Sequence, residues 1–233
     1  MTRDWDLRAD ELAGEAIGRG EPTAWFDRLY AEGIAGDISV PWDRDDPNPQ
    51  LAEWAEGVAL DGTGRQAVVV GCGLGADAEY VASRGFATTA FDIAPAAIGE
   101  VRRRRPESTV DYRVEDLLAL SPDLAGRFDL VVEIFTLQAL PDPPRQQAVD
   151  AVVGLVAPGG TLVAVAFRDN GSEPAGQGPP FPLDGDFMGS LARGGLELVR
   201  LDEVAGPRWL AEYRRHCRDV IRTEPEPGVA PSV

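Results

Sequence analysis

Residues 67–92, AVVVGCGLGADAEYVASRGFATTAFD, decide the fold of this chain. The stretch begins with four apolar residues in a row, as in a strand that is covered on both faces of a parallel sheet. Three alternating glycines, a helical pattern and a second β-branched run follow in that order. This order predicts a βαβ unit of an open α/β sheet.

The glycine turn and the end of the second strand predict a nucleoside site. Gly71, Gly73 and Gly75 allow the backbone to turn tightly and to approach a ligand, and the helix that follows offers free N–H groups. Cys72 lies inside the turn, so we expect its backbone, and not its thiol, to face the ligand. Asp92 ends the next strand, where its carboxylate can accept hydrogen bonds from ribose hydroxyls, and the neighbouring Ile93 is assigned to the same site.

Alternating strand and helix patterns continue toward the C-terminus. They predict a Rossmann-like, doubly wound α/β fold with a seven-stranded, mostly parallel sheet and an N-terminal helical cap. We expect strands over 67–70, 87–91, 110–114, 128–132, 161–167, 196–201 and 209–213, helices over 77–84, 95–105, 144–156 and 184–193, and a turn at 158–160. Residues 1–60 are rich in aromatic side chains and are interpreted as a cap or lid, residues 61–222 as the core with an acceptor loop over 168–183, and residues 223–233 as a disordered tail.

The composition of the chain restricts the kinds of molecule that it can bind. The chain has 233 residues and a net charge of −17, and such a surface repels the phosphates of nucleic acids. No run approaches the roughly 20 apolar residues of a membrane span. The two cysteines have no metal-ligand spacing. We therefore expect a cytoplasmic monomer or homodimer that holds no metal and binds neither nucleic acid nor a membrane.

Two further motifs carry a family resemblance. Glu115-Asp116-Leu117 follows the third expected strand, and FDLVVEIFTLQAL occupies residues 128–140. With these motifs, residues 66–214 resemble the class I S-adenosylmethionine-dependent methyltransferases. The resemblance implies S-adenosylmethionine as the cofactor, Asp116 and Leu117 as adenine contacts, and a segment over 133–138 that faces the methionine moiety and the acceptor. Site residues implied in that segment are Glu133, which is also the candidate acid–base group, and the acceptor contacts Phe135 and Gln138.

The flanks of the core resemble one group within that family, the thiopurine, thiol and halide methyltransferases. The resemblance rests on Phe26 and Tyr30, four residues apart on one helix face, on the VPWD segment at 40–43, and on GPPF at 178–181. It implies that Phe26, Tyr30 and Trp42 close over the cofactor and that the loop covers the acceptor. The acceptor residues expected outside the 133–138 segment are Arg168, Pro179, Pro180 and Phe181.

The sequence differs from the thiopurine enzymes at the end of the fourth strand. Glu133-Ile134 stands where those enzymes have an Asp-Arg pair, and Ile134 cannot donate a hydrogen bond to an acceptor. We expect methyl transfer by proximity to a heteroatom of a small molecule, with thiol sulfur slightly preferred. The alternatives are an N- or O-methyltransferase of a secondary metabolite and a non-catalytic partner protein that binds S-adenosylmethionine. A nicotinamide oxidoreductase is disfavoured, because the chain lacks a Tyr-x-x-x-Lys motif and a hydride-site histidine.

Overall fold

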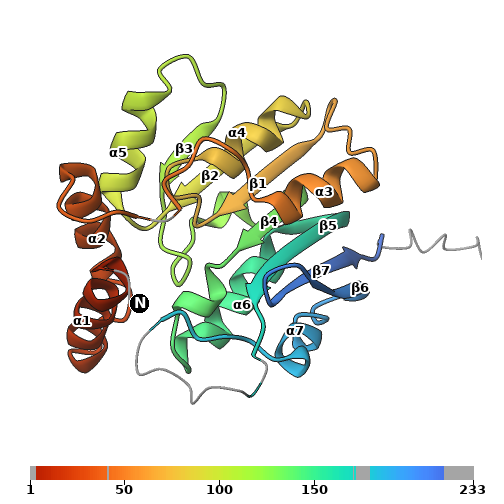
Figure 1. Ribbon diagram of the computed structural model, residues 1–233. Helices are drawn as coiled ribbons and strands as arrows, with labels where there is room; N and C mark the ends of the chain where they lie inside the picture. The colour runs from red at the N-terminus through yellow and green to blue at the C-terminus, as the bar shows by residue number, and fades with distance from the viewer. Residues whose placement is uncertain (1–3, 41, 170, 172–178, 218–233) are drawn as a thin grey trace, which may run out of the picture.

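A seven-stranded sheet forms the centre of the computed structural model, which describes residues 4–40, 42–169, 171 and 179–217 (Figure 1). The strand order is β3-β2-β1-β4-β5-β7-β6. The strands from β3 to β5 pair in parallel, whereas β7 pairs antiparallel with both β5 and β6. The predicted fold class is confirmed. The strands are β1 (Gln66–Val70), β2 (Ala87–Asp92), β3 (Asp111–Val114), β4 (Phe128–Ile134), β5 (Val156–Phe167), β6 (Leu196–Val204) and β7 (Arg208–Arg215).

Helices cover both faces of this sheet. One face carries α3 (Pro49–Gly57), α4 (Ala76–Ser83) and α5 (Pro95–Arg104), and the other carries α6 (Pro144–Leu155) and α7 (Gly185–Ser190). The short 3-10 turns η1 (Pro122–Leu124) and η2 (Leu137–Ala139) flank β4 in the sequence. Successive side chains of β1 point to opposite faces of the sheet and pack under the helices on each face. This explains why the strand is apolar at every position from Ala67 to Val70.

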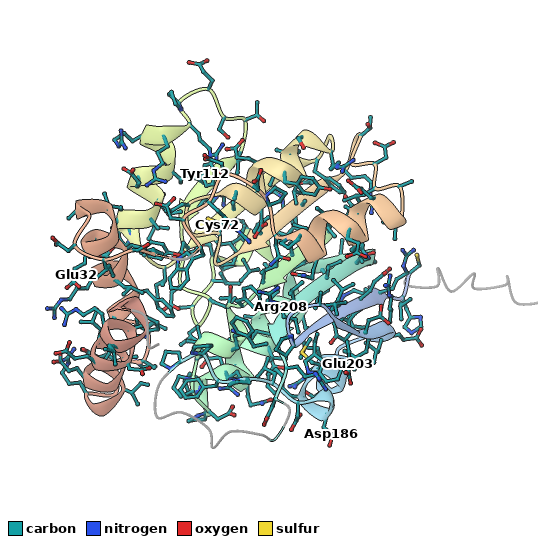
Figure 2. The ribbon with its side chains drawn as sticks, in the orientation of Figure 1. Glu32, Cys72, Tyr112, Asp186, Glu203 and Arg208 are labelled. Atoms are coloured by element: carbon teal, nitrogen blue, oxygen red, sulfur yellow. The ribbon has the colours of Figure 1, made fainter. Side chains whose placement is uncertain are left out.

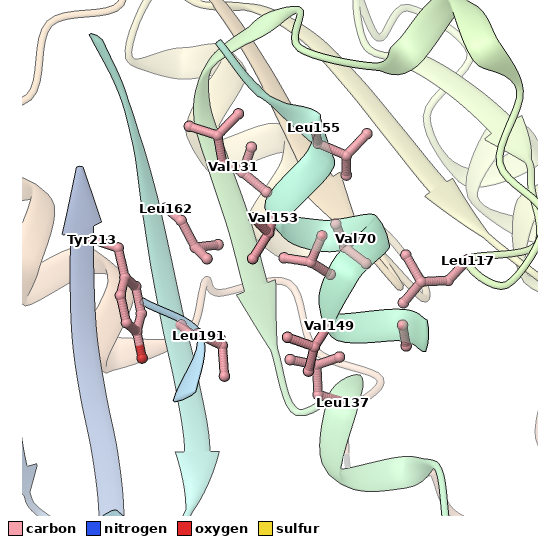
Figure 3. Packing of buried hydrophobic residues seen from close by; sticks show 14 of the residues in the cluster. Val70, Leu117, Val131, Leu137, Val149, Val153, Leu155, Leu162, Leu191 and Tyr213 are labelled. Atoms are coloured by element: carbon pink, nitrogen blue, oxygen red, sulfur yellow. The ribbon is translucent and has the colours of Figure 1, made fainter. Parts of the chain in front are cut away.

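The layer beneath α6 shows how the sheet is stabilised (Figure 3). Val149 and Val153 of α6 pack against Val131 of β4 and Leu162 of β5, and all four are almost completely buried. Burying each such side chain stabilises the fold by ~1.5–3 kcal/mol. At the edge of this layer the Tyr213 hydroxyl donates to the Met188 carbonyl at 2.6 Å, which fixes α7 against β7.

The predicted turn at 158–160 is wrong: this segment is an irregular stretch inside β5. The strand begins at Val156, and its register against β4 shifts between Phe128 and Leu130. Gly160 permits this irregularity because a Cβ there would lie 2.8 Å from the Phe128 carbonyl oxygen. The predicted helix over 184–193 is shorter, and it ends at Ser190.

The N-terminal segment contributes to two parts of the molecule. Helices α1 (Asp4–Gly18) and α2 (Trp25–Ala35) pack on each other, and α2 also packs on α5. Helix α3 lies on the sheet itself, where the Trp54 indole N–H donates to Glu212 of β7 at 2.9 Å. Among the described residues, no helix combines the length and the apolar character needed to cross a membrane. The predicted tail at 223–233 lies outside the described residues.

The strand order places the topological switch point of the sheet at the carboxyl ends of β1 and β4. The chain leaves β1 toward β2 on one side and later returns to place β4 on the other side. In open α/β sheets, ligands bind at such a switch point, outside the carboxyl ends of the strands. The predicted site residues that follow β1, β2, β3 and β4 all lie at this edge.

Candidate cofactor and acceptor site

The glycine turn after β1 is covered by side chains from two other parts of the chain. Gly71 and Gly73 have φ values of +59° and +51°, a region that L side chains rarely adopt. A Cβ on Gly71 would lie 2.3 Å from the Thr136 hydroxyl oxygen, and one on Gly73 would lie 2.6 Å from the Tyr30 hydroxyl oxygen. Gly75, also at positive φ, is the N-cap of α4. The turn therefore needs glycine both for its conformation and for the close approach of its neighbours.

Asp92 connects the glycine turn to the end of β2. Its Oδ2 accepts from the Gly73 amide at 2.9 Å, and its Oδ1 accepts from the Ala94 amide at 3.0 Å. Burial raises the pKa of this carboxyl, while the backbone hydrogen bonds lower it. Each carboxylate oxygen keeps a further lone pair. Asp92 is thus fixed in place and can still accept hydrogen bonds from a ligand.

The Glu115-Asp116-Leu117 motif lies beside Asp92. The Glu115 amide donates to the Asp92 carbonyl at 3.1 Å, so the end of β3 and the end of β2 converge. The Asp116 carboxylate closes a turn by accepting from the Leu118 amide at 2.8 Å, and the Leu117 side chain is buried. Ile93, next to Asp92, is half-buried. The structure therefore places Asp92, the predicted ribose-binding residue, beside Asp116 and Leu117, the predicted adenine contacts.

Glu133 is the last buried carboxylate at this edge, with 1% of its surface exposed. Its Oε1 accepts from the amides of Thr136 at 2.8 Å and Leu137 at 2.9 Å. Burial raises the pKa of Glu133 to about 7, although both amide hydrogen bonds lower it. The Thr136 hydroxyl in turn donates to the Val70 carbonyl at 3.2 Å. Glu133 thereby holds the turn after β4 against the glycine turn.

Two aromatic side chains of the N-terminal segment, Tyr30 and Trp42, lie over the glycine turn. The Trp42 indole N–H donates to the Tyr30 hydroxyl at 3.1 Å, and the two rings meet edge to face at 6.3 Å. Tyr30 is buried, and this burial raises the pKa of its hydroxyl well above its ordinary value. Phe26 stacks on Trp25 at 4.0 Å and packs against the buried clusters of both the cap and the core. Residue 41 lies outside the described residues.

The predicted acceptor residues Phe135 and Gln138 follow β4. Phe135 has a φ of +61°, and its ring stacks on Phe167 at 4.8 Å with an interplanar angle of 12°. Gln138 is buried, and its Oε1 accepts from the Phe167 amide at 2.6 Å. Its carbonyl oxygen accepts from the Phe181 amide at 2.7 Å. Gln138 therefore joins the end of β5 to the end of the predicted acceptor loop.

The remaining predicted acceptor residues lie in the segment that follows β5. Arg168 forms an ion pair with Glu203 at 3.1 Å and lies over the Trp209 ring. In the loop, Pro179 is buried, Pro180 is exposed and Phe181 is half-buried. Residues 170 and 172–178, which include Gly178 of the GPPF segment, lie outside the described residues.

Sequence reasoning missed three residues of this edge: Arg145, Arg208 and Gln50. The Arg145 guanidinium lies over the Phe181 ring at 5.3 Å, and the Arg208 guanidinium lies near Gln50 of α3 and over Phe135. No motif marks these side chains, because their contacts cross between segments far apart in the sequence. Within the part of the chain that the structure describes, no three histidine, cysteine, aspartate or glutamate residues could together hold a metal ion.

The match to a protein family covers the strands β1 to β4 and the start of β5. Residues 67–160 match the family model described as a methyltransferase domain. A ubiquinone biosynthesis O-methyltransferase of Azotobacter vinelandii (strain DJ) is 37% identical over 139 residues, which cover 55% of this chain and 58% of that protein. A protein of the same name from Xanthomonas axonopodis pv. citri is 35% identical over 130 residues, covering 52% of this chain and 53% of that protein. The chain thus spans just over half the length of these curated relatives.

Solved structures match most of the chain. The structure of the N-methyltransferase NodS from Bradyrhizobium japonicum WM9 with S-adenosyl-L-homocysteine gives a TM-score of 0.61 at 24% identity, covering 81% of this chain and 97% of that chain. The Burkholderia thailandensis 1,6-didemethyltoxoflavin-N1-methyltransferase, with bound S-adenosylhomocysteine, gives 0.62 at 16% identity, covering 93% and 92%.

Residues 67–160 thus match a methyltransferase domain, and the chain shares its fold with solved methyltransferase structures. S-adenosylhomocysteine, which is bound in both of these structures, is the demethylated form of the cofactor predicted for this chain.

Proposed function

We propose that this chain transfers the methyl group of S-adenosylmethionine to an oxygen or nitrogen atom of a small molecule. The observation that carries the proposal is the buried Asp92 carboxylate, held by the glycine turn and by the start of α5 with lone pairs left for a ligand. Support for an oxygen or nitrogen acceptor comes from the curated relatives, which are named O-methyltransferases, and from N-methyltransferases of the same fold.

The residues at the carboxyl edge of the sheet fit this cofactor. Asp92 would accept from its ribose hydroxyls, and the loop with Asp116 and Leu117 would hold the adenine. The rings of Tyr30 and Trp42 suit a sulfonium, which is a cation without N–H donors. When bound, S-adenosylmethionine supplies an electrophilic methyl group on positively charged sulfur.

The contribution of the protein to such a transfer is alignment of the acceptor and exclusion of water. Holding two reactants in one geometry can lower the barrier by ~7–11 kcal/mol. An acceptor hydroxyl or ammonium also needs a group that takes its proton. Glu133 is the candidate, because burial raises its pKa to about 7, a range suited to a general base at neutral pH.

A thiol acceptor is the second candidate. It rests on the aromatic residues over the glycine turn, Tyr30 and Trp42, and on the apolar wall formed by Pro179 and Phe181. A thiolate would need no strong general base. The two candidates therefore differ in their dependence on Glu133.

A panel of acceptors tests the proposal. Phenols, amines, thiols and halides would each be incubated with S-adenosylmethionine and scored for release of S-adenosylhomocysteine. We expect turnover with at least one phenol or amine and loss of that turnover in Asp92→Ala. Calorimetry that detects no binding of S-adenosylhomocysteine would refute the proposal, and turnover with thiols alone would establish the second candidate.

We also propose that residues 1–60 act as a lid on the cofactor. The support is the position of Tyr30 and Trp42 over Gly73. Hydrogen exchange over residues 24–43 should become slower when S-adenosylhomocysteine is added. Equal exchange with and without the ligand would mean that the cap is a static part of the fold.

A further inference from the structure

Arg208 begins β7 at the same edge of the sheet as the candidate site. It pairs in register with Phe167, the last residue of β5. Phe135, over which its guanidinium lies, is followed directly by Thr136, whose side chain contacts Gly71. Figure 2 shows Arg208 near the middle of the molecule, below Cys72 of the glycine turn in this view. Arg208 is therefore a cation at the carboxyl edge of the sheet, beside the residues proposed to contact the acceptor.

The guanidinium of Arg208 rests on two aromatic rings. Its centre lies 5.7 Å from the Phe135 ring centroid and 5.6 Å from the Phe167 ring centroid. These two rings are themselves stacked at 4.8 Å. Cation–π contacts of this kind fix the plane of a guanidinium without using its N–H donors.

The N–H donors of Arg208 are largely unused. Its buried Nε has no hydrogen-bond partner in the part of the chain that the structure describes, and its Nη1 makes only a long contact of 3.4 Å with the Gln50 side-chain oxygen. Among the described residues, no carboxylate lies within ion-pair distance of it. Arg168 also has a buried Nε without a partner, but its Nη1 pairs with Glu203 at 3.1 Å. A half-buried cation left without an anion in a chain of net charge −17 requires an explanation.

We infer that Arg208, Phe135 and Phe167 form a subsite for a planar acceptor that carries a carboxylate. The free N–H groups of a guanidinium match the two oxygens of a carboxylate. The rings beneath it provide an apolar surface for the planar part of the same molecule. This inference rests on the proposed function and names the acceptor class of that site, an aromatic carboxylate. The acidic surface of the protein repels anions. The unpaired Arg208 would attract an anionic acceptor to this site in spite of that repulsion.

Binding of matched pairs to the S-adenosylhomocysteine-saturated protein tests the inference. The pairs are benzoate with benzamide and 4-hydroxybenzoate with 4-hydroxybenzamide, and calorimetry gives each dissociation constant. We expect the wild-type protein to bind each carboxylate about tenfold more tightly than its amide, as charge-assisted hydrogen bonds predict. In Arg208→Gln this preference should fall to less than about twofold, and in Arg208→Lys, which keeps the charge but loses the planar fork, it should be intermediate.

A matched control is Arg65→Gln. Arg65 also lies over an aromatic ring, Phe86, but it precedes β1 and so lies at the opposite edge of the sheet. The control should keep the full carboxylate preference. Equal binding of carboxylate and amide by the wild-type protein, or a preference that survives in Arg208→Gln, overturns the inference.

The subsite and the proposed function can fail separately. An Arg208-dependent carboxylate preference in a protein that methylates no member of the acceptor panel would refute the function and leave the anion subsite in place. Methylation of neutral acceptors only, with unchanged kinetics in Arg208→Gln, would refute the subsite and leave the function in place.

Discussion

Glu133→Gln should change how the stability of this protein depends on pH. The carboxylate is almost fully buried, and its Oε1 accepts from the amides of Thr136 and Leu137. A glutamine in the same rotamer presents the same acceptor oxygen to both amides, but it cannot ionise. The variant therefore isolates the cost of the buried charge from the value of the two hydrogen bonds.

The pKa of Glu133 sets the sign and the size of the effect. Burial raises it from 4.5 to about 7 in the folded protein. Between these values the folded state binds more protons than the unfolded state, so the free energy of unfolding falls as the pH rises. Integrating the difference gives a loss of about 2.5 kcal/mol between pH 5 and pH 8, which Glu133→Gln should not suffer.

Urea unfolding of both proteins at pH 5, 6, 7 and 8 measures this difference. The free energy of unfolding of the variant, relative to wild type, should increase steadily over the series. A second variant, Glu107→Gln, changes an exposed glutamate and should give a constant offset. If the offset of Glu133→Gln is also constant with pH, Glu133 has an ordinary pKa and the argument from burial is refuted.

Three further predictions concern the ligand side of the site. Asp92→Ala should weaken binding of S-adenosylhomocysteine in calorimetry by ~1.5–3 kcal/mol or more, since it removes a charged acceptor, and unchanged affinity would contradict the assignment. Gly73→Ala should lower both the affinity for the cofactor and the melting temperature, because its Cβ would lie 2.6 Å from the Tyr30 hydroxyl. The control Gly99→Ala, which has open space around its Cβ, should impair neither binding nor folding. Phe181→Ala should raise the KM of the acceptor while the dissociation constant of the cofactor changes by less than about threefold, under ~1 kcal/mol; the reverse pattern would place the loop on the cofactor side.

The fold and the cofactor side of the site could be predicted because their signals are local in the sequence. An apolar strand, a glycine turn and a helix are adjacent along the chain, and the next strand brings Asp92 to the same edge. Parallel pairing then places everything that follows β1, β2 and β3 together without further information. This is why the glycine turn, Asp92 and the Asp116-Leu117 motif could be placed from the sequence.

The acceptor side could not be predicted to the same depth, because its contacts are tertiary. Nothing in the sequence around Arg208 distinguishes it from arginines that have carboxylate partners, such as Arg168. The register of β7 against β5 places it on Phe167, and the backbone of Phe135 turns a second ring beneath it. Gln138, expected to face the acceptor, uses its side-chain oxygen on the backbone of β5.

Glu133 links the two sides of the site, and this position separates its two proposed roles. Its hydrogen bonds to Thr136 and Leu137 fix the turn in which Phe135 holds a φ of +61°, a conformation that costs roughly 1–3 kcal/mol and persists only where its surroundings enforce it. Glu133→Gln preserves these hydrogen bonds. If Glu133 only positions the turn, the variant should therefore have the KM, kcat and pH profile of the wild type. If Glu133 is instead a general base, the variant should bind the cofactor normally, lose most of its kcat and show no rise in rate through pH 7. The stability series and the rate profile of the same variant therefore decide between a positioning residue and a catalytic one.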